Sequence, residues 1–166
     1  MLHNSLKKSL LQVETILAGI AELPALEAHE AYVGKRIGSH VRHVVDHFLA
    51  LLKLTASDTV DYNLRSRNSP TETDIAYARN QVAGIIDSLE SVIFGSREVV
   101  CLSEIDISES KTAAFNSTAD REALWVLNHT IHHIALIKLI AEQSGLSLSS
   151  DLGVAPATAS FQRASS

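Results

Sequence analysis

The stretch TADREALWVLNHTIHHIALIKLIAEQ, residues 118–143, has the apolar spacing of one long amphipathic helix. Ser117 and Asp120 resemble a capping box with Asp in place of Glu, and Gly145 suits the end of the helix. His129 and His133 are four residues apart, so both side chains lie on one face. That face also carries core-type residues and one acid: Glu122, Trp125, Leu136 and Ile140. The stretch therefore predicts a long helix whose histidines face the protein core.

Three more helices are predicted, over residues 4–23, 38–55 and 71–94. In the first, apolar residues recur at spacings of four and three, the period of one helical face: Leu6, Leu10, Val13, Leu17 and Ile20. Pro24 ends that helix, while Pro70 and Gly95 suit the start and the end of the helix over 71–94. The chain is therefore expected to be helical along most of its length.

The connections between these helices predict their arrangement. The link over residues 56–70 is long enough to run back along an 18-residue helix, so the second and third helices are expected to be parallel. VVCLSEI (99–105) and KTAAFN (111–116) have the composition of a small β-hairpin between the third and fourth helices. We predict an all-α fold, a single four-helix bundle with long crossovers, over residues 1–155. Residues 156–166 are predicted to be a frayed tail with one helical turn at Pro156.

Composition limits the functions to consider. The chain has 166 residues, 14 Lys and Arg against 19 Asp and Glu, and a net charge of −5. Because no basic cluster is present, nucleic-acid binding is not expected. The single cysteine, Cys101, cannot form an internal disulfide and suits a reducing compartment. The sequence shows no apolar signal core and no run of 18 apolar residues, so we expect a cytoplasmic protein without a membrane span.

A second histidine cluster lies in GSHVRHVVDHF, residues 38–48. His40, His43 and His47 fall within one sector of the helix, beside its apolar face. A single core-facing histidine is most often a hydrogen-bonded core residue. Two clusters on two core-facing helices instead indicate a divalent metal ion, because buried imidazoles without partners are costly and one ion satisfies several of them. Asp46 and Glu122 are candidate acceptors for the outer histidine nitrogens.

The motifs HVRHVVDH (40–47) and NHTIHHIALI (128–137) resemble those of the DinB superfamily, the DinB/YfiT-like metal-binding four-helix bundles related to bacillithiol and mycothiol S-transferases. The resemblance implies one ligand from the second helix and an HxxxH pair from the fourth, around Zn²⁺, Ni²⁺ or Fe²⁺. The pair falls on His129 and His133, and the other ligand falls most naturally on His43. His47 and His40 are its rivals, and His132 is expected in the outer sphere or on the surface.

The resemblance favours a metal-dependent enzyme that transfers a small-molecule thiol to an electrophile. One alternative is a metal-dependent hydrolase that uses metal-bound water, with Glu122 or a spare histidine as the base. Another is a metal-binding or stress-response bundle without catalysis. The residues assign no catalytic group among these possibilities.

Substrate contacts and partners are predicted from fewer residues. Arg65 and Arg67 could hold a substrate carboxylate or phosphate, or pair with surface acids. Tyr62 could hydrogen-bond to a ligand of the metal, and Trp125 could form a substrate platform, but both residues also suit core packing. The long apolar helix faces predict a homodimer.

Overall fold

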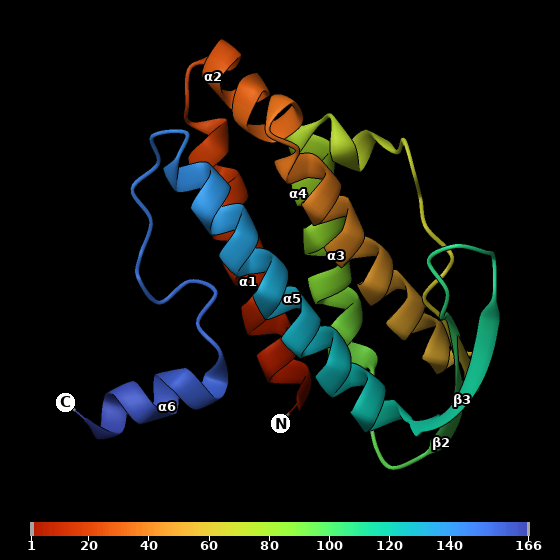
Figure 1. The fold of residues 1–166 in the computed structure, drawn as a ribbon. Coiled ribbons are helices and arrows are strands. Elements are labelled where there is room, and N and C mark those ends of the chain that lie inside the picture. Colours follow the sequence, from red (N-terminus) through yellow and green to blue (C-terminus); the bar gives the residue numbers. More distant parts are fainter. Residues whose placement is uncertain (1, 166) are drawn as a thin grey trace.

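The computed structural model describes residues 2–165 of the chain (Figure 1). Six α-helices and three strands follow in the order α1 (Leu2–Ala21), α2 (Ala25–His29), α3 (Ile37–Leu52), β1 (Thr59–Asp61), α4 (Ile75–Ser88), β2 (Glu98–Glu104), β3 (Thr112–Thr118), α5 (Ala119–Glu142) and α6 (Pro156–Ala164). Short 3-10 turns flank α4, and a π-helical turn, Glu30–Gly34, precedes α3.

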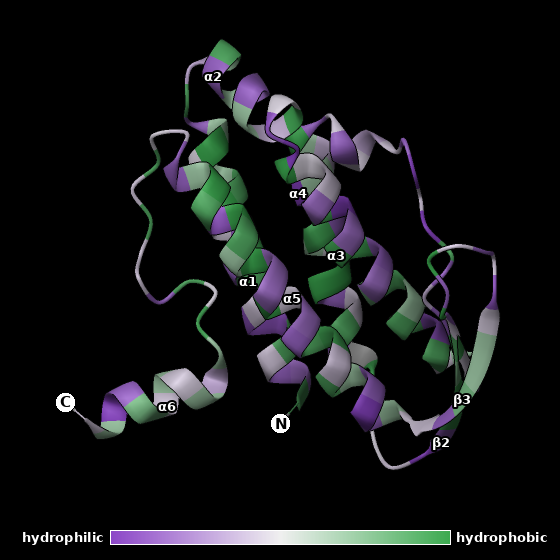
Figure 2. Cartoon of the chain, viewed as in Figure 1, coloured by the Kyte–Doolittle hydropathy of each residue, from purple (hydrophilic) through white to green (hydrophobic). Residues whose placement is uncertain are grey.

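Four long helices surround one hydrophobic core. Helix α5 packs against α1 and α3, and α4 packs against the other sides of the same two helices. Each long helix carries hydrophobic and hydrophilic residues on different sides (Figure 2). The five apolar residues predicted to face inward from the first helix are all fully buried: Leu6, Leu10, Val13, Leu17 and Ile20. The apolar period therefore identifies the buried face of α1 correctly.

The segment between α3 and α4 crosses the length of the bundle. Figure 1 shows the chain leaving the end of α3 and returning beside the sheet to the other end, where α4 begins. As a result α3 and α4 run in the same direction, which is the arrangement that the long link predicted. The returning segment places Tyr62 against His47 of α3, and its Ser66 backbone N–H donates to Asp46 of the same helix.

The all-α prediction is wrong, because the chain has an α+β fold. Strands β2 and β3 pair antiparallel, with Cys101 opposite Phe115, as the predicted hairpin requires. A third strand, β1, extends the sheet by pairing in parallel with β2, with Val60 opposite Cys101. Strand β1 has only three residues, so it has too little alternation to be recognised locally. It forms because the link after α3 passes beside β2 and buries Val60.

Element ends also differ from the prediction. The expected helix over 71–94 is shortened to α4, because Asp74 has an extended backbone and its side chain accepts a hydrogen bond from the Tyr77 backbone N–H. Helix α2 and the π-helical turn occupy a segment for which no helix was predicted, and Ala31 and Tyr32 of that turn are buried. In the tail, α6 has nine residues where a single turn was expected, and none of its residues is buried.

Among the described residues, α5 is the one helix long and apolar enough to cross a membrane by length and composition. It packs against α1 and α3 within the core. A core helix of this kind passes the same test, so α5 is only weak evidence for a membrane span.

Candidate metal centre

Three histidines from two helices converge where α3 crosses α5. His43 comes from α3, and His129 and His133 come from successive turns of α5. One ring nitrogen from each lies within 4.8 Å of the corresponding nitrogens of the other two. The Nε2 atoms of His43 and His129 are 2.9 Å apart. These are the three residues that the sequence predicted as metal ligands.

The remaining predicted histidines surround this triad. The His47 ring centroid lies 4.3 Å from that of His43 and 4.6 Å from that of His129, and His47 Nδ1 lies 2.7 Å from the His43 carbonyl oxygen. His40 Nδ1 lies 3.2 Å from His133 Nδ1. His132 is exposed, with its ring centroid 5.5 Å from that of His133. His40 and His47 therefore contact the triad from two sides, and His132 lies at its outer edge.

The environment of the triad keeps the three rings neutral. Burial, reinforced by the neighbouring imidazoles, lowers the pKa of His43 to about 2 and that of His133 to about 3. The same two causes lower the pKa of His129 to about 4. Burial also lowers the pKa of His40 and of His47. Neutral imidazole is the form that coordinates a metal ion, so at neutral pH no proton needs to be displaced from these rings.

An aromatic wall covers one side of the triad. The Trp125 ring stacks on that of His129, with centroids 4.9 Å apart and an interplanar angle of 11°. Tyr62 stacks on His47 at 5.2 Å and 21°. The Tyr62 and Trp125 ring centroids are 4.6 Å apart. The two residues predicted as substrate contacts are thus packed against the histidines, where they fix ring orientations.

The two carboxylates that were predicted to accept hydrogen bonds from the histidines have other partners. Asp46 is buried and accepts hydrogen bonds from Arg42 Nη1 at 2.9 Å and from the Ser66 backbone N–H at 3.2 Å. Glu122 accepts a hydrogen bond from the Ser117 hydroxyl at 2.5 Å. Within residues 2–165, neither carboxylate accepts a hydrogen bond from an imidazole. Sequence reasoning missed Arg42, although its four-residue spacing from Asp46 is the spacing of a helical ion pair.

Arg65 and Arg67 lie on the link between α3 and α4, and both are exposed. The positive charge of Arg65 contributes to the lowered pKa values of His43, His47 and His129, so it acts on the triad. Within the described residues 2–165, no hydrogen bond or ring contact joins Arg67 to a histidine.

The donor set fits a divalent transition-metal ion. A tetrahedral ion with bonds of about 2.1 Å requires ligand nitrogens roughly 3.4 Å apart. The His43 and His129 Nε2 atoms are 2.9 Å apart, and one nitrogen of each of the three rings lies within 4.8 Å of the others. Each neutral ring has one nitrogen free to coordinate. Three imidazoles with no carboxylate also match the preference of zinc-like ions over magnesium or calcium.

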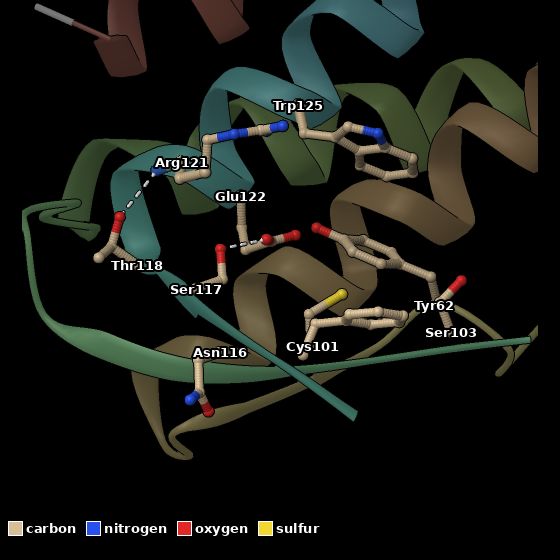
Figure 3. Close-up of a pocket in the computed structure, with 10 residues that line it drawn as sticks. Tyr62, Cys101, Ser103, Asn116, Ser117, Thr118, Arg121, Glu122 and Trp125 are labelled. Carbon is tan, nitrogen blue, oxygen red and sulfur yellow. Dashed lines mark hydrogen bonds between the residues drawn. The ribbon is translucent and has the colours of Figure 1, made fainter. Parts of the chain in front are cut away.

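Beside the aromatic wall lies a cavity of about 470 Å³, shown in Figure 3. It is bounded by Tyr62 from the link, by residues of β2 and β3, and by the first turns of α5. Tyr62 and Trp125 line it from the side of the histidines, and no histidine lines it directly. Cys101 of β2, for which the sequence analysis predicted no role in a site, also lines this cavity.

The chain matches one named protein over most of its length. It is 34% identical over 119 residues to FK506-binding protein 5 of the fungus Rhizopus delemar. The match covers 68% of this chain but 31% of that protein, so the chain corresponds to less than a third of its relative. No protein-family profile matches the chain, and no solved structure matches it.

These findings correct the resemblance to the DinB superfamily. No family profile supports it, and the matching relative has a different name. The thiol S-transferase function is withdrawn with it, and the family no longer supports a choice of zinc or nickel as the metal. The resemblance rested mainly on the two histidine motifs, and similar arrangements of functional residues recur on unrelated folds. A metal site must therefore be argued from the geometry of the triad.

Proposed function

We propose that this chain is a metal-binding domain in which His43, His129 and His133 hold one divalent transition-metal ion. The observation that carries the proposal is the convergence of three neutral imidazole nitrogens within 4.8 Å, from two packed helices. A bound ion of this kind acts as a Lewis acid toward an oxygen, nitrogen or sulfur atom of a further ligand.

The packing around the triad supports this role. His43 lies on α3 and the other two ligands lie on α5, so the core contacts between these helices hold the three rings in place before an ion arrives. The stacking of Trp125 on His129 limits rotation of that ring. Rings held in place in this way lose little conformational freedom on binding, which favours affinity.

The test is direct metal binding by protein produced without a polyhistidine tag. Chelator-treated protein is dialysed against Zn²⁺, Ni²⁺, Co²⁺ or Fe²⁺, the last under anaerobic conditions, and bound metal is measured by mass spectrometry. We expect about one ion per chain for at least one of these metals. A His129→Ala/His133→Ala variant is expected to lose that ion, because it removes two of the three ligands.

His29→Ala is the matched control, because His29 is exposed on α2, outside the cluster. It should bind as the unaltered protein does. Circular dichroism shows whether each variant is folded. If the unaltered protein binds none of the four metals, or if the double variant binds as much as the His29→Ala control, the proposal is wrong.

FK506 binding is a second candidate function, favoured by the relative's name and by 34% identity over 119 residues. The match covers 31% of that protein, so FK506 binding by this chain is a proposal. Isothermal titration of the chain with FK506 tests it, once with chelator and once with metal. Saturable binding at one molecule per chain would support it, and the absence of heat at micromolar concentrations would reject it.

We also propose a cytoplasmic location and a homodimer. The single cysteine, Cys101, supports the cytoplasmic location, because proteins of reducing compartments rarely contain disulfides. Exposed apolar side chains on helix surfaces, such as Leu11 on α1 and Leu139 on α5, support the second.

A further inference from the structure

The cavity beside the aromatic wall has its own chemistry, separate from the histidine triad. Its volume of about 470 Å³ lies in the size range of small-molecule sites. Strand β3 and the first turns of α5 form one side, and β2 with Tyr62 forms the other (Figure 3).

A buried carboxylate faces this cavity without a cationic partner. Glu122 is 6% exposed, and its hydrogen bond from the Ser117 hydroxyl supplies no positive charge. Arg121 also lines the cavity, but it is exposed and extends beside Trp125 (Figure 3). Among residues 2–165, none of the ion pairs joins Arg121 to Glu122. A buried negative charge without a counter-charge is costly, so this site favours a ligand that brings one.

The Tyr62 hydroxyl lies beside this carboxylate. Tyr62 is 7% exposed and its hydroxyl is directed toward Glu122 (Figure 3). Burial, followed by the interaction with Glu122, raises the pKa of this hydroxyl. The oxygen of this hydroxyl can accept a hydrogen bond from a ligand N–H group while Glu122 accepts another.

Aromatic rings form the rest of the wall. Tyr62 and Trp125 line the cavity on the side of the metal centre, and the half-exposed Phe115 of β3 lines it as well. The faces of aromatic rings attract cations, and more so where water is excluded. A buried carboxylate beside three aromatic rings is therefore complementary to an organic ammonium ion.

We propose that this cavity binds a small organic ammonium, with its N–H groups on Glu122 and Tyr62 and its hydrocarbon part against Trp125 and Phe115. No histidine lines the cavity, so none of the proposed ligand contacts is a proposed metal ligand.

The experiment uses the intrinsic fluorescence of Trp125, the only tryptophan in the chain. Chelator-treated protein is titrated with benzylammonium chloride, with benzyl alcohol as a neutral analogue and with benzoate as an anionic one. We expect saturable quenching by benzylammonium, at least tenfold weaker binding of benzyl alcohol, and no saturable response to benzoate.

Glu122→Gln keeps the size of the side chain and an acceptor for Ser117 but removes the charge, so benzylammonium should bind at least tenfold more weakly. Glu142→Gln, at the other end of α5, is the matched control and should bind as the unaltered protein does. Phe115→Leu should weaken binding several-fold without unfolding the chain, since Phe115 is 49% exposed.

Equal binding of benzylammonium and benzyl alcohol, or no saturable response to benzylammonium, would overturn the proposal. Unchanged affinity in a folded Glu122→Gln variant would also overturn it. If circular dichroism shows that this variant is unfolded, the comparison of the three ligands and the Phe115→Leu variant decide. Because the protein is free of metal, failure here leaves the proposed metal site unaffected.

Discussion

At the scale of single residues, the histidines differ in role because of what each ring contacts. His43, His129 and His133 each have a ring nitrogen within 4.8 Å of the other two. In contrast, His47 Nδ1 lies within hydrogen-bonding distance of the His43 carbonyl oxygen, and the His47 ring stacks on Tyr62. Asp46 is part of the same neighbourhood but pairs with Arg42 and holds the returning link at Ser66. One carboxylate thus anchors the segment that carries Tyr62.

The lowered pKa values predict acid sensitivity of the metal-free protein. A histidine in the unfolded chain titrates near pH 6.5, whereas the His43, His129 and His133 pKa values in the folded chain are about 2, about 4 and about 3. Below pH 6.5 the unfolded chain therefore binds protons that the folded chain does not, and the free energy of unfolding falls as the pH falls. We expect the melting temperature of chelator-treated protein to decrease steadily from pH 7 to pH 5.

Thermal melts followed by circular dichroism at half-unit steps of pH measure this dependence. That range lies above the usual pKa values of carboxyl groups, so histidines dominate it. Replacing His129 and His133 by Ala should flatten the slope, and His29→Ala should leave it nearly unchanged. A melting temperature that stays constant, or rises, between pH 7 and pH 5 would contradict the lowered pKa values.

At the scale of elements, two short turns pack closely against the start of α3 and fix its position. The 3-10 turn Pro70–Glu72 packs against the start of α3, and the Tyr32 hydroxyl from the π-helical turn donates a hydrogen bond to the Thr71 carbonyl oxygen at 2.5 Å. Gly38 lies at this junction, where a methyl group would overlap the Glu72 carbonyl oxygen and contact the Tyr32 ring. The backbone at Gly38 therefore has no room for a side chain.

Two glycine substitutions in helices should have opposite effects. Gly38→Ala should lower the free energy of unfolding by about 2 kcal/mol, because backbone must move to admit the methyl group. Gly84→Ala in α4 should raise it by about 0.5 to 1 kcal/mol, because the added methyl group meets nothing within 4 Å and alanine favours the helix. Urea unfolding of both variants measures the difference, and equal effects of the same sign would refute this account of the junction.

At the scale of the whole molecule, the C-terminal segment divides into a packed part and an unpacked part. Leu146, Leu148 and Leu152 pack against the core after α5 ends. The Gly153 backbone N–H donates to the Gln12 side chain of α1 at 2.9 Å, and Gly153 lies against the backbone of Ala135. Helix α6 follows with no buried residue and extends away from the bundle (Figure 1).

Two truncations should separate these parts. A chain that stops after residue 155 should melt within about 2 °C of the full chain, because α6 buries nothing. A chain that stops after residue 144 should melt about 5 °C lower or more, because three leucines and the Gln12 contact are lost. Thermal melts of the two truncated chains measure these melting temperatures. A decrease much larger than 2 °C in the chain that stops after residue 155 would mean that α6 contributes to stability.

Much of the local structure could be predicted from the sequence, because helical periodicity is a local property. The spacing of Leu6, Leu10 and Val13 identified the buried face of α1, and the composition of residues 99–116 indicated the β2–β3 pair. The spacing of His129 and His133 likewise placed both rings on one face of α5. In each case neighbours within a few residues carry the signal.

The sequence by itself determined which residues share a face, and only the tertiary structure decided which faces meet. His40, His43 and His47 are equivalent by spacing, and the crossing of α3 on α5 brings His43 to the pair on α5. Strand β1 exists because β2 lies beside it, and Glu122 faces a cavity instead of a histidine because β3 places Ser117 against it. The contacts between α3 and α5 and between β1 and β2 join residues tens of positions apart, so their energies depend on the packing of whole elements and not on local propensity.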